Sequence, residues 1–151
     1  MLQKLDRPNK DGLRAVILAP TRELAFQIHR EALKLCDLRS FKICLLSTLN
    51  PHSESNLSQI KGYDILISTP SRLVQSLDTK VLNLSKVEHL ILDEADNLLE
   101  EESFILSVDQ VLASLSPTCA KYLFSATIPA GVEELARSVM RDPIRVVIGE
   151  K

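Results

Sequence analysis

The sequence predicts an α/β fold, in which a mostly parallel sheet carries helices on both faces. Two observations predict it. Short apolar runs rich in β-branched residues alternate with longer segments whose apolar residues recur at helical spacing. The short runs are also continuously apolar, which is typical of strands that are buried on both faces of a parallel sheet. The 151 residues fit a single domain of this kind.

Six segments have the character of strands. The first, RAVILA at 14–19, is bounded by Gly12 and Pro20, and the last is IRVVI at 144–148. The six predicted strands are 14–19, 41–46, 64–68, 87–92, 120–124 and 144–148.

Helices are expected between these strands. Apolar spacing predicts helices at 21–36, 71–77 and 129–140, and Ser103 is expected to cap a helix that Pro117 ends. The polar segment 50–58 is interpreted as a loop or a weak helix. Residues 1–12, which include Pro8 and Gly12, are interpreted as a flexible lead-in.

Composition sets limits on function. Eighteen basic and twenty acidic residues give a net charge of −2, so charge alone gives no reason to expect nucleic acid. It does not exclude it, because backbone N–H groups and a few arginines can hold phosphate. The three cysteines share no metal-ligand spacing and are expected to be buried, reduced thiols. No signal peptide and no apolar run of ~20 residues is visible, which predicts an intracellular protein without a membrane partner.

Polar groups follow four of the predicted strands, at the edge where a parallel sheet binds its ligands. An Asp at a strand end can hold Mg²⁺, and a neighbouring Glu can polarise a water for attack on a phosphoryl group. Thr and Arg at helix N-termini suit phosphate. Ser125 and Thr127 are expected to hydrogen-bond to Asp96. The four groups are Pro20-Thr21-Arg22-Glu23, Thr69-Pro70-Ser71-Arg72, Asp93-Glu94-Ala95-Asp96 and Ser125-Ala126-Thr127.

Each group also has a simpler explanation when it is taken alone. Acidic residues at a strand-to-helix junction are often helix caps, and Thr-Pro or Ser-Ala-Thr segments are often turns. Isolated arginines are usually surface residues. The occurrence of all four groups, in order and each at a strand end, is what these explanations leave unaccounted for.

This ordered set resembles the first RecA-like domain of the DEAD-box RNA helicases, from about residue 13 to residue 151. The resemblance lies in motif Ia at 20–24, motif Ib at 69–72, motif II at 93–96 and motif III at 125–127. It therefore implies an incomplete RecA-like domain that belongs to an enzyme coupling ATP hydrolysis to RNA unwinding or to remodelling of RNA–protein complexes.

The resemblance also implies a role for each matching residue. Asp93 would bind the Mg²⁺ of ATP through water, and Glu94 would orient or activate the attacking water. Asp96 would contact Ser125 and Thr127 and link hydrolysis to strand separation. The residues that would hold the sugar–phosphate backbone of RNA are Pro20, Thr21, Arg22, Thr69, Pro70 and Arg72. The RNA would be single-stranded or duplex, and DNA is not expected as a partner. A second RecA-like domain would be a further partner.

The sequence departs from the family pattern in three places. Ser71 stands where the family usually has Gly, and the segment 47–51 lacks the family's Gly-Gly motif. This lack, together with Ile28-His29-Arg30-Glu31, resembles a subfamily that assembles the small ribosomal subunit, which implies a nuclear or nucleolar location. No glycine-rich phosphate loop ending in Gly-Lys-Thr occurs in the sequence. The chain is therefore expected to be a fragment that neither binds ATP tightly nor hydrolyses it alone.

The missing loop has a structural consequence. In RecA-like sheets its strand lies between the motif III strand and the strand that follows, here 120–124 and 144–148. Without it these two strands would be separated by about two strand spacings, ~9.6 Å. They are expected to close up, to pair with another molecule, or to leave the last strand and helix loose.

Two other functions were considered. A non-catalytic module would keep the RNA-facing corners and bind RNA or protein without turnover. A phosphoacceptor signalling domain also has an Asp at one strand end and a Ser or Thr at the next. That domain requires an acidic pair after its first strand, where this chain has Pro20-Thr21, so the sequence disfavours it.

Overall fold

The computed structural model describes residues 1–8, 12–36, 40–48 and 54–149. Five parallel strands form one sheet in the order β2–β3–β1–β4–β5. The predicted α/β class and the first five predicted strands are therefore confirmed. The strands are β1 (Ala15–Leu18), β2 (Ile43–Leu45), β3 (Ile65–Ser68), β4 (His89–Leu92) and β5 (Ala120–Leu123).

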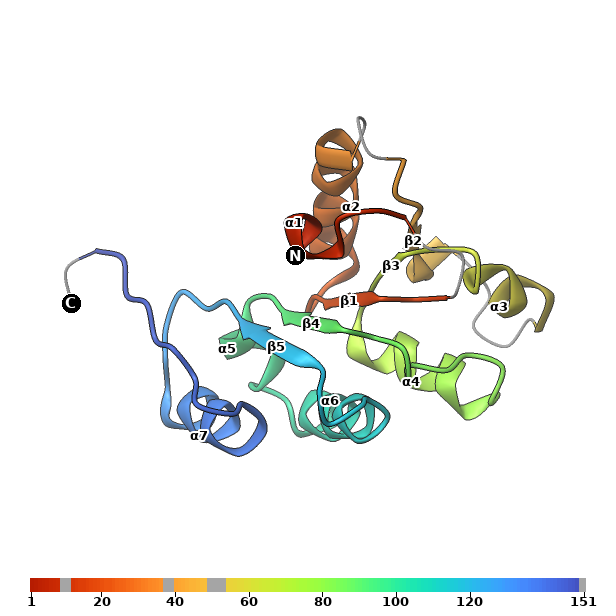
Figure 1. Cartoon of the computed structure of the whole chain (residues 1–151). Coiled ribbons are helices and arrows are strands. Elements are labelled where there is room, and N and C mark those ends of the chain that lie inside the picture. The colour runs from red at the N-terminus through yellow and green to blue at the C-terminus, as the bar shows by residue number, and fades with distance from the viewer. Residues whose placement is uncertain (9–11, 37–39, 49–53, 150–151) are drawn as a thin grey trace.

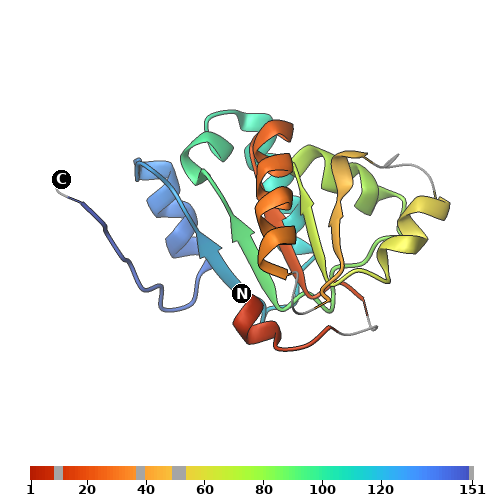
Figure 2. The same ribbon diagram turned by 90° about the horizontal axis from the view of Figure 1, so that it is seen from above.

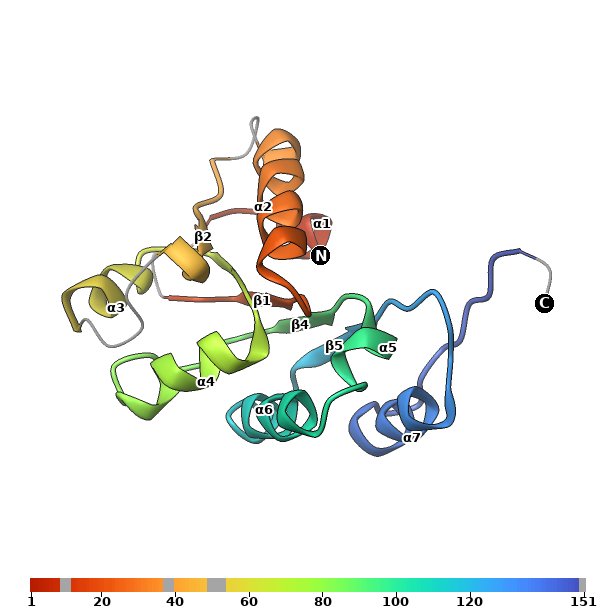
Figure 3. The same ribbon diagram turned by 180° about the vertical axis from the view of Figure 1, so that it is seen from behind.

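Helices cover both faces of the sheet, as expected. On one face lie α1 (Leu2–Leu5) and α2 (Arg22–Cys36), which stand over the sheet in Figure 1 and cross it in Figure 2. On the other face lie α4 (Pro70–Asp78), α6 (Glu102–Ala113) and α7 (Ala130–Val139), seen together in Figure 3. The remaining elements are a 3₁₀ turn η1 (Leu46–Thr48), α3 (Glu54–Ile60) and α5 (Ala95–Leu98). Among the described residues, no helix has the length and apolar character needed to cross a bilayer.

The core divides at β1, whose four residues are at most 7% exposed. Successive side chains of a strand point to opposite faces. Val16 and Leu18 therefore join the cluster on the face of α4 and α6, whereas Ala15 and Ile17 join the cluster beneath α2. A continuously apolar strand is the sequence that such a two-faced position requires.

Most helix boundaries match the sequence pattern. The hydroxyl of Thr21 caps α2 by accepting the N–H of Leu24 at 3.1 Å, and Pro70 occupies the first turn of α4. The prediction that Ser103 caps the next helix is wrong, because α6 begins at Glu102 with Glu101 in the cap position. The segment 50–58 contains most of α3. Residues 49–53, which include the end of the segment 47–51 that lacks the Gly-Gly motif, lie outside the described residues.

The lead-in at 1–12 differs from the expectation of flexibility. Its first residues form the helical turn α1, and Leu5 is 2% exposed because it packs into the cluster beneath α2. The guanidinium of Arg14 donates to the backbone carbonyls of Leu5 at 3.1 Å and Arg7 at 2.8 Å. Two features therefore fix this turn, a buried leucine and a cation that satisfies the carbonyls at its end. Residues 9–11 lie outside the described residues.

The predicted sixth strand is wrong. Residues 143–148 have no regular secondary structure and run out beyond α7 (Figures 1 and 2). Ile144 is 92% and Ile148 is 95% exposed. An apolar β-branched run becomes a strand only beside an edge with which it can pair, and no described strand lies next to this run. The two segments, 120–124 and 144–148, do not close up, because residues 144–148 pair with no described strand, and α7 stays packed through the buried Val132. Pairing of the last segment with another molecule stays a prediction.

Candidate active site at the carboxyl edge of the sheet

The register of the sheet brings the four polar groups to one edge, as predicted. Leu18 of β1 is in register with Ser68 of β3 and with Leu92 of β4, and Leu92 is in register with Leu123 of β5. Backbone hydrogen bonds continue past the strand ends, from the Ala19 N–H to the Ser68 carbonyl and from the Asp93 N–H to the Leu18 carbonyl, both at 3.0 Å. The loops after these strands therefore start at the same level.

The strand order divides this edge into two parts. The Pro/Thr/Arg groups follow β1 and β3, which are neighbours, and the acidic and hydroxyl groups follow β4 and β5, which are also neighbours. The sequence order of the strands does not reveal this division, since β1 lies between β3 and β4 in the sheet.

The acidic part begins at the end of β4. Asp93 is half-buried, and its Oδ1 accepts the backbone N–H of Glu94 at 3.0 Å. Glu94 has left-handed backbone angles, φ 48° and ψ 55°, which are uncommon for a residue other than glycine. Its carboxylate Oε2 accepts a hydrogen bond from Asn97 Nδ2 at 2.8 Å. Asn97 was not among the predicted site residues, although its position three residues after Glu94 is the spacing at which helical side chains meet.

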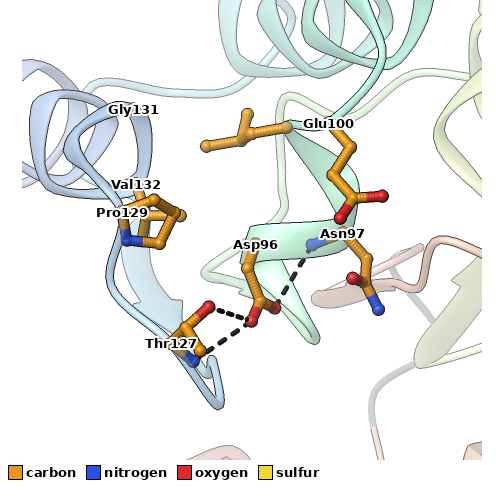
Figure 4. A pocket seen from close by; sticks show the side chains of 8 residues that line it. Asp96, Asn97, Glu100, Thr127, Pro129, Gly131 and Val132 are labelled. Atoms are coloured by element: carbon orange, nitrogen blue, oxygen red, sulfur yellow. Dashed lines mark hydrogen bonds between the residues drawn. The ribbon is translucent and has the colours of Figure 1, made fainter.

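Asp96 connects β4 to β5 and confirms the predicted contacts with Ser125 and Thr127. Its Oδ2 accepts the Thr127 hydroxyl at 2.6 Å and the Thr127 backbone N–H at 3.1 Å, while its own N–H donates to Ser125 Oγ at 3.1 Å. Figure 4 shows Asp96 between Thr127 and the backbone of Asn97, beside a pocket of about 560 Å³ between α5 and α7. The Thr127 hydroxyl is the main cause that holds the pKa of Asp96 below its usual value.

The donor set fits a metal ion that keeps most of its water. Among the described residues, no three His, Cys, Asp or Glu side chains gather as a complete metal site. Mg²⁺ usually retains several waters and takes one or two carboxylates together with substrate phosphates. A single carboxylate at a strand end, with one oxygen already fixed by a backbone N–H, matches that kind of binding at Asp93.

The other part of the edge presents two helix N-termini. Pro20 and Pro70 are buried at the turns, Thr21 and Arg22 are exposed at the start of α2, and Thr69 and Arg72 are half-buried at the start of α4. The first backbone N–H groups of a helix favour anions. The Thr21 hydroxyl already serves as the cap of α2, so this residue has a structural role in addition to any contact with a ligand.

Known proteins of one family are similar to this chain. Residues 1–135 match the family model of the DEAD/DEAH box helicases. The probable ATP-dependent RNA helicase ddx52 of Dictyostelium discoideum is 48% identical over 153 residues, which cover 100% of this chain and 23% of that protein. The DEAD-box ATP-dependent RNA helicase 57 of Arabidopsis thaliana is 49% identical, over 100% of this chain and 28% of that protein.

Solved structures include a similar protein. The crystal structure of a DEAD box protein from Methanococcus jannaschii superposes with a TM-score of 0.78 at 33% identity, over 89% of this chain and 37% of that chain. The chain thus spans about a quarter of the length of the curated relatives that it matches.

Proposed function

The chain belongs to the DEAD/DEAH box helicase family, and we propose that it supplies part of the ATP-hydrolysis site and part of the RNA-binding surface of an ATP-dependent RNA helicase. The observation that carries the proposal is the Asp96 contact with Ser125 and Thr127. It joins the acidic group after β4 to the hydroxyl group after β5. The named ATP-dependent RNA helicases among its relatives support the same activity.

The acidic residues have separate tasks in this proposal. Asp93 would hold Mg²⁺, and the ion would offset the charge of the phosphates. Glu94 accepts a proton from the attacking water or orients it. Asp96 couples this edge to β5 through the hydroxyl groups of Ser125 and Thr127. The 151 residues contain no Gly-Lys-Thr loop. The proposal therefore requires phosphate-binding groups from outside these 151 residues.

The neighbouring loops after β1 and β3 form the RNA-binding part. Thr21, Arg22, Thr69 and Arg72 contact sugar and phosphate, as do the backbone N–H groups at the starts of α2 and α4. Such contacts bind RNA without reading its sequence. The substrate class that follows is RNA in general, and the role in assembly of the small ribosomal subunit, with a nucleolar location, rests on the subfamily resemblance.

A hybrid helicase tests the hydrolytic role. In it, this chain replaces the matching 153-residue stretch of the Dictyostelium relative, with which it is 48% identical. We expect RNA-stimulated ATP hydrolysis from the hybrid, and a fall of about 10²–10⁴-fold after Glu94→Gln, because the substitution removes the base. Glu134→Gln is the matched control, since Glu134 is exposed on α7 and does not line the pocket beside Asp96. A folded but inactive hybrid, or an unchanged rate after Glu94→Gln, would contradict the proposal.

RNA binding is tested by a second pair of variants. Arg22→Gln in the hybrid is expected to weaken binding of a single-stranded RNA, measured by fluorescence anisotropy at one fixed salt concentration. Arg30→Gln makes the same charge change eight residues further along α2, ~12 Å from the edge, and both arginines are exposed. Equal weakening by the two substitutions would show that the contact is diffuse and not located at the start of α2.

Measurements of ATP binding and RNA binding distinguish the enzyme from the non-catalytic module. Because affinity for ATP in this class depends on the phosphate loop, we expect no saturable ATP binding by the isolated chain in calorimetry. RNA binding by the hybrid helicase that is the same with and without ATP would favour the module. Saturable ATP binding would show that β4 and β5 alone form a nucleotide site.

A further inference from the structure

Asn97 joins the two halves of the acidic site. Its side-chain Nδ2 donates to Glu94 Oε2 at 2.8 Å, and its backbone N–H donates to Asp96 Oδ1 at 3.2 Å. Asp96 in turn accepts the hydroxyl of Thr127 at 2.6 Å. An unbroken series of contacts therefore runs from Thr127 through Asp96 and Asn97 to Glu94, and Asn97 is the member that reaches the side chain of Glu94.

Glu94 needs such support because of where it stands. It occupies the cap position before the four-residue helix α5, in a left-handed backbone conformation that residues other than glycine rarely adopt. Its backbone N–H is fixed by Asp93 Oδ1, but its side chain is long and only half-buried. A glutamate in this setting samples several rotamers unless another group holds it. The hydrogen bond from Asn97 Nδ2 is such a contact on that carboxylate.

We propose that Asn97 is a positioning residue for Glu94, holding Oε2 so that Oε1 is left to accept a proton from the attacking water. This inference rests on the proposed function, in which Glu94 acts on that water. A positioned base accelerates proton transfer only when its heavy atom is within hydrogen-bond reach of the reacting proton. An amide donor suits the task, since it donates a hydrogen bond to the carboxylate and does not itself ionise.

The same contacts connect Asn97 to the loop after β5. Because its backbone N–H bonds to Asp96 and its side chain bonds to Glu94, Asn97 connects the contact between Thr127 and Asp96 to the carboxylate of Glu94. The Thr127 hydroxyl donates to the carboxylate of Asp96 and thereby lowers its pKa. Asn97 thus links the loop after β5 to the chemistry after β4.

Kinetics of the hybrid helicase test the role. We expect Asn97→Ala to lower kcat roughly tenfold, less than the loss of the base itself, with the KM for ATP and the RNA concentration for half-maximal stimulation unchanged. In the Glu94→Gln background the same substitution is expected to cause no further loss, because its partner is already altered. Gln110→Ala, which removes an exposed amide from α6, is the control and leaves kcat unchanged.

A spectroscopic measurement on the isolated chain tests the contact without any turnover. The side-chain amide signals of Asn97 in a ¹H–¹⁵N spectrum are expected to shift after Glu94→Ala and to stay in place after Glu134→Ala. Unmoved signals overturn the inference. So does an active hybrid in which Asn97→Ala leaves kcat unchanged, or lowers it equally with and without Glu94. An inactive unsubstituted hybrid contradicts the proposed function instead, which separates the two failures.

Discussion

The two edges of the sheet have one strand neighbour each, yet they differ in burial. All three residues of β2 are buried, at 5–7% exposure, whereas in β5 Ala120 is exposed and the other three residues are half-buried. The two edge strands differ in how many of their faces pack against other elements. The strand β2 contributes Ile43 and Leu45 to the cluster beneath α2 and Cys44 to the cluster on the opposite face.

The strand β5 has helices on one face only. Leu123 packs against the cluster on the face of α6 and α7. On the other face α2 lies over β1, β3 and β2 and does not reach β5 (Figures 1 and 2), and Phe124, just past the strand, is 57% exposed. An edge strand of this sheet is therefore buried when other elements pack on both of its faces. The comparison predicts that the β2 side is the more stable half.

The largest expected effect comes from matched leucine truncations. Leu45→Ala in β2 is expected to cost about 3 kcal/mol of unfolding free energy, because it leaves a cavity in a fully covered core. Leu123→Ala in β5 is expected to cost about 1 kcal/mol, since half-buried methyl groups lose less on truncation. Urea unfolding of both variants measures the difference, with Ile148→Ala as a control near zero. Equal costs would refute the comparison.

The next effect concerns two thiols of equal exposure. Cys44 in β2 and Cys119 beside β5 are both 5% exposed, and burial raises the pKa of each, that of Cys44 to about 11. If the β5 side opens more readily, an alkylating reagent should modify Cys119 at least about tenfold faster, which corresponds to ~1.4 kcal/mol less opening free energy. Mass spectrometry of peptides against time measures both rates. Faster labelling of Cys44 would reverse the predicted order.

A smaller effect is expected from the contact that ties the loop after β5 to α5. Thr127→Val removes the hydroxyl that Asp96 accepts, and we expect a loss of about 1 kcal/mol at pH 7. Because the pKa of Asp96 is lowered in the folded state, this contribution is present above the unfolded pKa of ~3.9 and disappears as the pH falls through the folded value. Denaturant midpoints of both proteins from pH 6 to pH 2.5 should therefore converge in acid.

The smallest effect is expected at the opposite end of the sheet. Arg14 pairs with Glu88 at 2.7 Å, and the hydrogen bond from Arg14 lowers the pKa of Glu88. The glutamate is exposed, so Glu88→Gln should cost only about 0.5 kcal/mol. Thermal unfolding in low and high salt checks this, since salt should reduce the difference. A loss several times larger would show that Arg14 needs Glu88 in order to hold α1.

Local pattern was sufficient for much of this fold. The runs at β1, β3 and β4 are apolar throughout, and the helical spacing of α2 and α7 is regular. The fold class, the succession of strands and helices along the chain and most of their boundaries therefore follow from the sequence. The candidate residues also follow, because each stands directly after a strand. Their roles in binding and catalysis remain predictions, with the exception of the Asp96 contacts with Ser125 and Thr127, which the structure contains.

Two errors have the same physical origin. The run at 144–148 has strand composition but no edge beside it, and the lead-in has loop composition but a leucine that finds the core beneath α2. In both segments a distant partner decides the outcome. The contact between Asn97 and Glu94 is a third example, since it depends on the left-handed turn at Glu94, which nothing in the local composition indicates.

By itself, the sequence determined the parallel α/β class, the family and the acidic and hydroxyl groups that follow β4 and β5. Only the tertiary structure decided that the Thr and Arg corners after β3 and β1 lie side by side and next to these groups, that one edge strand is covered and the other is not, and that Asn97 reaches Glu94. The reason is that backbone preference and apolar period act within a few residues, whereas strand order, burial and side-chain contacts depend on which distant segments become neighbours.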